Sequence, residues 1–244
     1  MIAQVNAEML KIRTTRTTIG IVLAMVALTL LFTLLSGLLT KTPSLTSTED
    51  QRGLLSVGGL AGVFSALAGI MLVTSEYRHG TIRPTLLFNP RRSRIVGAKL
   101  AAGLLAGLVF GIVGEGLSFA IGYACLASRG IDYALNAGQT TLLLLGTLAG
   151  VALFGALGVG IGTVVRNQVG SIIGLLAWGF IVENLLFAFV PSVGRFAPGQ
   201  ASNAFTGLTT KHLLPAAAGG AILLAWTIAF AVAATGLAAR RDVT

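Results

Sequence analysis

The sequence predicts an all-α integral membrane protein with six transmembrane helices. Only 10% of its 244 residues are charged, whereas soluble domains carry about a quarter. Six apolar segments, each long enough to cross a bilayer, alternate with shorter polar segments. The net charge of +9 comes from cationic residues in those polar segments rather than on one soluble face. This placement is typical of membrane-flanking loops and argues against nucleic-acid binding.

Residues 1–18 are predicted to form an amphipathic helix at the membrane interface. Ile2, Val5, Met9 and Ile12 recur at three- and four-residue spacing and make one apolar stripe on a basic helix. A charged anchor before the first span is the alternative reading. A cleaved signal peptide is disfavoured, because the apolar segment that follows is longer than a signal-peptide core and has no clear A-x-A cleavage site.

The six spans form a single transmembrane domain that covers residues 1–244. The third span is the longest, so it must tilt or project beyond the bilayer. Residues 191–214 hold Pro191 and Pro198 and are too broken to cross. The predicted spans are residues 19–39, 53–74, 95–127, 139–165, 169–190 and 215–239.

An even number of spans puts both termini on the same side of the membrane. The termini and the loops after spans 2 and 4 hold twelve Lys and Arg residues, and the other loops hold five. Positively charged loops stay in the cytoplasm. We therefore expect a multi-pass protein of the cell membrane with both termini cytoplasmic.

Residues 75–99 form the longest polar interruption and hold six of the seventeen Lys and Arg residues. Gly80 is expected to end the second span, and Thr81 can cap a new helical turn with Pro84 inside it. Asn89-Pro90 would end that turn. The pattern predicts short ordered elements on the cytoplasmic side rather than free coil.

This loop carries a resemblance to a known family. It follows the pattern E–x3–GT–x8–P–x3–R–x4–K, which resembles the loop between spans 2 and 3 of type-2 ATP-binding-cassette (ABC) exporter permeases. The six-span pattern, the basic N-terminal helix and the broken segment after span 5 are similar too, so the resemblance covers nearly the whole chain. The matching residues are Glu76, Gly80, Thr81, Pro90, Arg94 and Lys99.

The resemblance implies a permease subunit that pairs with a second permease, as a homodimer or heterodimer, above two ATPase subunits. The loop would be the coupling helix, with Glu76, Arg78, Gly80 and Thr81 at the ATPase interface. Residues 1–18 would be the interfacial connecting helix, and residues 191–214 would form short external helices. The cargo would be a drug, a peptide or a lipid-like molecule, moved by alternating access.

The chain itself is not expected to be an enzyme. It contains no G-x-x-x-x-G-K-[ST] sequence, the loop that cradles nucleotide phosphates. ATP and magnesium would therefore bind the partner ATPase, and no cofactor is expected on this chain. The single cysteine and two histidines have no metal-ligand spacing, and no nucleophile–base pair suggests an intramembrane enzyme.

Three polar residues inside predicted spans are candidates for the transport path. Glu115 lies in the third span, and Glu183 and Asn184 lie in the fifth. Intramembrane carboxylates are costly and usually face the bundle interior or a watery cavity. They could line an export path, or be structural, with Glu183 pairing with Asn184, Arg195 or a partner subunit. The alternative function is a proton-coupled secondary transporter that uses both glutamates, although no internal repeat supports it.

Many of the 32 glycines recur every four residues within the predicted spans, as at 103, 107 and 111. Such spacing lets helices approach closely in lipid. It does not separate packing within one chain from packing between subunits.

Overall fold

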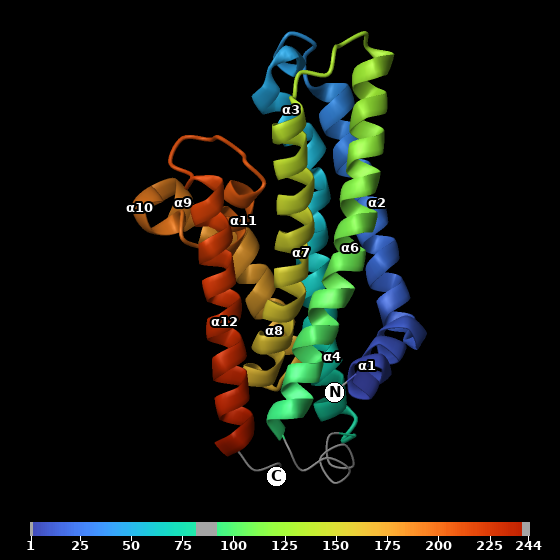
Figure 1. Ribbon diagram of the computed structural model, residues 1–244, viewed down its shortest axis with the longest axis vertical. Coiled ribbons are helices and arrows are strands. Elements are labelled where there is room, and N and C mark those ends of the chain that lie inside the picture. The colour runs from blue at the N-terminus through green and yellow to red at the C-terminus, as the bar shows by residue number, and fades with distance from the viewer. Residues whose placement is uncertain (1, 82–91, 241–244) are drawn as a thin grey trace.

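The computed structural model describes residues 2–81 and 92–240, and every regular element in these ranges is helical. The long helices stand side by side along the longest axis of the molecule (Figure 1). They are α2 (Arg16–Leu39), α3 (Thr48–Leu55) with η2 (Ser56–Leu60) and α4 (Ala61–Arg78), α6 (Arg92–Ser128), α7 (Ala137–Val165), α8 (Gln168–Ala177) with η3 (Trp178–Val182) and α9 (Glu183–Phe189), and α12 (Ala216–Arg240).

Residues 2–81 and 92–240 contain six helices that are long and apolar enough to cross a membrane, which confirms this part of the prediction. Five of them begin within about three residues of the predicted positions. The second begins earlier, at Thr48, because Ser47 caps α3 and its hydroxyl accepts a hydrogen bond from the Asp50 N–H. Glu49 and Asp50 in the first turn also favour a helix start there.

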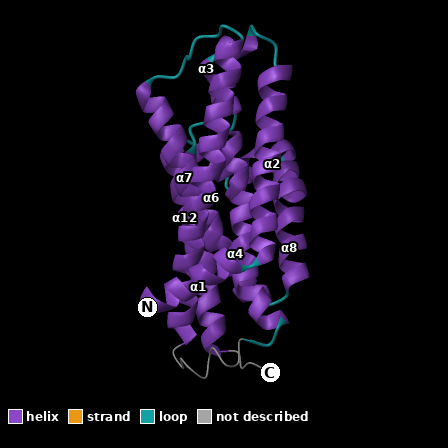
Figure 2. Ribbon diagram, turned by 90° about the vertical axis from the view of Figure 1, so that its right-hand side faces the viewer, coloured by secondary structure: helices purple, strands orange, loops and turns teal. Residues whose placement is uncertain are grey.

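Shorter elements lie at both ends of the bundle. Helix α1 (Ile2–Thr14) packs against α2, α4 and α6 at the end where α12 also finishes (Figures 1 and 2). The broken segment before α12 folds into α10 (Pro191–Gly194) and α11 (Pro198–Phe205), each with its proline in the first turn. A 3-10 turn, η1 (Ser44–Thr46), follows α2.

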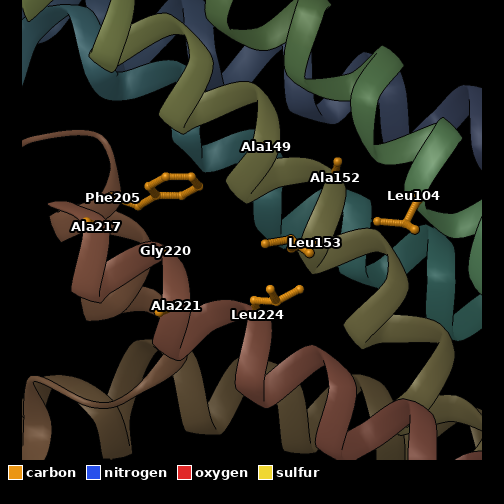
Figure 3. A pocket seen from close by; sticks show the side chains of 9 residues that line it. All are labelled: Leu104, Ala149, Ala152, Leu153, Phe205, Ala217, Gly220, Ala221 and Leu224. Atoms are coloured by element: carbon orange, nitrogen blue, oxygen red, sulfur yellow. The ribbon is translucent and has the colours of Figure 1, made fainter.

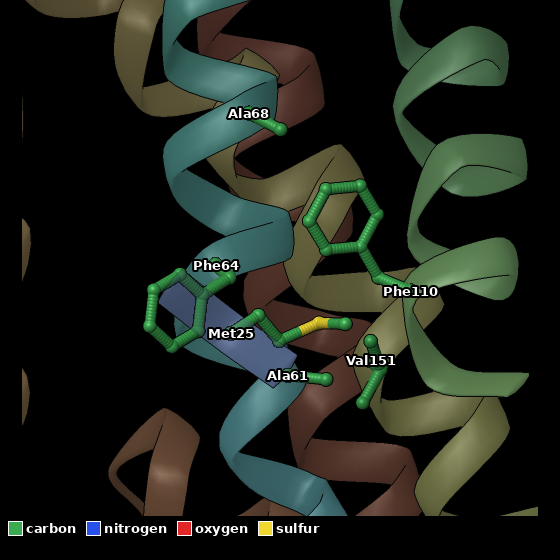
Figure 4. Packing of buried hydrophobic residues seen from close by; sticks show 6 residues of the cluster. All are labelled: Met25, Ala61, Phe64, Ala68, Phe110 and Val151. Atoms are coloured by element: carbon green, nitrogen blue, oxygen red, sulfur yellow. The ribbon is translucent and has the colours of Figure 1, made fainter. Parts of the chain in front are cut away.

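Helices α4, α6 and α7 form the centre of the bundle. In these three spans, 56–67% of an apolar 18-residue stretch is buried. In the spans of α2, α8–α9 and α12 the buried share of such a stretch is 6–22%. Phe64 of α4, Phe110 of α6 and Val151 of α7 meet in one apolar cluster with Met25 of α2 (Figure 4). The outer helices therefore leave wide apolar faces exposed on this chain.

The structure separates the glycines into two groups. A Cβ at Gly103 or Gly107 of α6 would lie within 2.8 Å of the α7 backbone, and one at Gly158 of α7 would overlap the carbonyl oxygen of Ala66 in α4. These glycines let the three central helices pack backbone to backbone. Gly174 of α8, in contrast, faces open space.

Long polar side chains hold together the loops at the end opposite α1. Arg129 donates to the carbonyls of Gly37 and Thr40 and so satisfies the last turn of α2. Buried Gln51 donates to the carbonyls of Leu45 and Asp132. Arg52 donates to the carbonyl of Gly207, which follows α11. Three connections are thereby fixed to one another.

We expect Gly158→Ala to destabilise the protein by about 1–3 kcal/mol, because overpacking separates α4 from α7. Thermal unfolding in detergent should show a clear drop in Tm. Gly174→Ala is the matched control. It should leave Tm unchanged or raise it, since alanine has a higher helix propensity than glycine and a Cβ at position 174 would contact no other atom in the described residues. Equal effects of the two substitutions would contradict the close packing of the central helices.

Candidate functional site

A buried ammonium group joins three helices near the start of α6. Lys99 is only 3% exposed, and its Nζ donates to both carboxylate oxygens of Glu8, each at 3.0 Å, and to Oε1 of Glu76 at 2.8 Å. It also donates to the carbonyl of Leu72 at 3.2 Å. Lys99 therefore ties α6 to α1 and to α4 at once.

Lys11 completes the group, which we name the charge cluster: Glu8, Lys11, Glu76 and Lys99. Lys11 Nζ lies 2.6 Å from Oε1 of Glu76 and 3.2 Å from Oε1 of Glu8. Burial lowers the pKa of Lys11, but the hydrogen bond to Glu76 and the charge of Glu8 outweigh it and leave the pKa above its ordinary value. Two carboxylates and two ammonium groups balance one another.

The apolar stripe of α1 positions the charge cluster. Met9 and Ile12 pack against buried Leu72, Val73 and Ala102 of α4 and α6. This half of the stripe therefore faces the bundle, whereas Ile2 at the start of the helix is 80% exposed. Glu8 lies beside the stripe and is directed inward with it.

The sequence reasoning did not identify Glu8 and Lys11. One signal could have indicated them, because Glu8 is the single acidic residue among the first 48 and has Lys11 one turn away. The structure also brings together Glu76 and Lys99, which the loop pattern had named separately. Both lie on helices, since α4 continues to Arg78 and α6 begins at Arg92.

The other residues of the loop pattern lie outside the charge cluster. Arg78 and Arg94 are exposed, and Arg78 reaches the side-chain oxygen of Gln168 at 3.4 Å. Gly80 has a φ of +69°, which suits glycine and turns the chain away from α4. Thr81 follows it on the exposed surface. Pro90 lies outside the described residues.

Glu115 is buried at the contact between α6 and η2. It is 1% exposed, and neither carboxyl oxygen has a hydrogen-bond partner in the described part of the chain. Its backbone lies directly against Gly58, where the helix tightens into the 3-10 turn η2. The neighbouring hydroxyl of Thr147 donates to its own helix, to the carbonyl of Leu143.

Glu183 and Asn184 satisfy backbone groups of two different helices. Glu183 is buried, and its Oε1 accepts the N–H of Gln200 at 2.6 Å, so it caps the first turn of α11. Asn184 is exposed, and its amide donates to the carbonyls of Gly179 and Phe180 in the π-helical segment η3. That segment widens the helix and alters its hydrogen bonding, and the side chain compensates. The two glutamates thus contact different elements.

No group of three or more metal-ligating side chains occurs in residues 2–81 and 92–240. No protein-family model matches the chain, and no curated protein matches it.

Replacing Lys99 with Met should lower the free energy of unfolding by about 3–5 kcal/mol, because two buried carboxylates lose their main counter-ion. The matched control is Arg94→Met, which removes an exposed cation one turn earlier on the same helix and should change stability by less than about 0.5 kcal/mol. Thermal unfolding of both variants measures the two losses of stability for comparison.

A double variant, Lys99→Met with Glu76→Gln, checks that the loss arises from the interaction itself. Its destabilisation should be smaller than the sum of the two single variants, since it removes one charge of each sign. Simple additivity, or equal effects of Lys99→Met and Arg94→Met, would contradict the charge cluster as a joint between helices.

Proposed function

We propose that this chain is the membrane-spanning subunit of an ATP-driven exporter, paired with a second permease subunit and served by two separate ATPase subunits. The observation that carries the proposal is the charge cluster. It joins α1, α4 and α6 at the two places where the polar connection of residues 79–91 leaves and re-enters the bundle.

The charge cluster makes the connection a suitable place to receive force. Sliding α4 past α6 would separate charges that are buried from water, which costs several kcal/mol. A push on the connection would therefore move α1, α4 and α6 together. Helix α7 would follow, because it packs backbone to backbone on α4 and α6 through glycines.

The surface around the connection suits a partner protein. Four residues of this region are exposed: Arg78, Gly80, Thr81 and Arg94. Glu76 and Lys99 are buried and form an ion pair with each other. In our proposal the exposed residues contact the ATPase, and the buried pair transmits the movement. The excess of cations at this end favours a cytoplasmic location, where ATP is present.

The wide apolar faces of α2 and of α8–α9 support a second permease subunit as partner, with lipid covering what remains. Among the three candidate path residues, Asn184 lies on such a face, whereas Glu115 and Glu183 are enclosed by their own chain. We propose that Asn184 meets cargo or the second subunit. The cargo would be a drug, a peptide or a lipid-like molecule.

The test is affinity purification of the tagged chain from native membranes in mild detergent, followed by mass spectrometry. We expect an ATPase to co-purify and Gly80→Val to reduce its recovery, because valine at a positive φ distorts the turn after α4. Gly130→Val is the matched control. Gly130 has a similar φ of +65°, also faces open space, and follows α6 at the opposite end.

Recovery of the ATPase with Gly130→Val but not with Gly80→Val would support the coupling surface. A chain that purifies without any ATPase would overturn the exporter proposal. Equal losses in the two variants would indicate general misfolding and would contradict a specific role of Gly80.

A proton-coupled transporter is the second candidate, and Glu115 is the observation that favours it. Buried carboxyl groups inside membrane spans commonly belong to proton relays, and Glu115 is 1% exposed. This candidate predicts that a proton gradient drives transport by the chain alone in vesicles, and that Glu115→Gln abolishes it. Glu183, which the sequence had also suggested as a proton carrier, caps α11 instead, so Glu183→Gln is the control: its amide oxygen can still accept from the Gln200 N–H. Absence of gradient-driven transport would eliminate the candidate.

A further inference from the structure

Two adjoining hollows form an apolar groove along α7. The first, about 430 Å³, is bounded by α7 and α12, with Leu104 of α6 and Phe205 of α11. The second, about 590 Å³, continues toward the start of α7. Both are lined by Ala149 and Phe205. Figure 3 shows Leu104, Leu153 and Leu224 at one end and Phe205 at the other. We call the two together the α7 groove.

Phe205 explains why the α7 groove exists. A Cβ at Gly220 of α12 would lie 2.8 Å from the Phe205 ring, and one at Gly146 of α7 would lie 2.5 Å from the Phe205 carbonyl oxygen. The end of α11 is therefore wedged between α7 and α12. Alanines on the facing helix surfaces, such as Ala152 and Ala221, are too small to fill the space beside the wedge.

The lining selects for hydrocarbon. Its side chains are apolar apart from Thr141, and that hydroxyl donates to the carbonyl of Ala137 within its own helix. An extended peptide in the groove would leave backbone N–H and C=O groups without partners, at several kcal/mol each in the membrane. A hydrocarbon chain has no polar groups to satisfy.

A cationic and a hydrogen-bonding side chain lie on the connection that joins two residues lining the α7 groove. Lys211 and His212 are exposed on the connection between Phe205 and Ala217, both of which line the groove. This connection arches beyond the start of α12 (Figure 1). A lysine ammonium is a point charge suited to a phosphate, and a histidine N–H can donate to one.

We propose that the α7 groove holds one acyl chain of a phospholipid whose anionic headgroup lies against Lys211 and His212. The dimensions agree with this occupant. The groove follows α7 from Ala137 to Leu153, about 24 Å at the rise of an α-helix. One leaflet of hydrocarbon is about 15 Å thick, so a single chain fits with its headgroup at the interface. The proposed lipid site depends on insertion of the chain into a membrane but not on binding of an ATPase.

The experiment uses the full-length protein, without an ATPase, in vesicles that contain a phosphatidylglycerol with a photoactivatable acyl chain. After illumination, mass spectrometry locates the lipid adducts. We expect them to concentrate in residues 137–153 and 217–224. Ala221→Trp should fill the groove and reduce these adducts several-fold. Ala233→Trp, on an exposed part of the same helix outside the groove, should leave them unchanged.

A second pair of variants tests the headgroup. Lys211→Ala should reduce the preference of the groove for phosphatidylglycerol over phosphatidylcholine, and Lys41→Ala, an exposed lysine before η1, should not. An unchanged preference in Lys211→Ala would overturn the headgroup assignment. If Ala221→Trp does not fold, Ala149→Leu narrows both hollows and takes its place.

Adducts spread evenly over the exposed faces of α2, α8–α9 and α12 would overturn the proposal, because the groove would then be ordinary lipid-facing surface. Adducts that persist in both groove-filling variants would do the same. These outcomes do not depend on ATPase recovery, so the lipid site and the exporter proposal can fail separately.

Discussion

The requirement that a buried ammonium group have counter-ions governs the end of the bundle where α1 lies. Lys99 can remain out of water only because Glu8 and Glu76 both reach it. One carboxylate comes from α1 and the other from the last turn of α4. This interaction, together with the packing of Met9 and Ile12, therefore fixes α1 relative to the two helices that flank the polar connection.

A different constraint governs the packing of the central helices α4, α6 and α7. Apolar helices gain no hydrophobic free energy by associating in lipid, so their association depends on close packing. Gly103 and Gly107 face α7, and Gly158 faces α4, which allows backbones to touch. The outer helices lack such contacts over most of their length. A firmly packed centre joined to more exposed outer helices is compatible with the proposed exporter, in which subunits would move against each other.

Several polar side chains at helix ends and at irregular turns satisfy backbone hydrogen-bonding groups. Glu183 caps α11, Asn184 accompanies a π-helical segment, and Arg129 satisfies the last turn of α2. Each lies where a helix ends or changes its hydrogen-bonding pattern. Glu115 is different, since it lies against Gly58 without a hydrogen-bond partner in the described residues. Thr29 and Ser65, which also lie in spans, likewise have buried hydroxyl oxygens without a hydrogen-bond partner in the described residues.

The sequence by itself determined the helical class and the approximate limits of the six long helices, apart from the earlier start of the second. A run of about twenty apolar residues is a local property, and the bilayer thickness makes it decisive. It also marked Glu76 and Lys99 through their place in the loop pattern. Only the tertiary structure paired these two residues, added Glu8 and Lys11, and separated packing glycines such as Gly158 from open ones such as Gly174. Those outcomes depend on which helix faces meet, and helices far apart in the sequence decide that together.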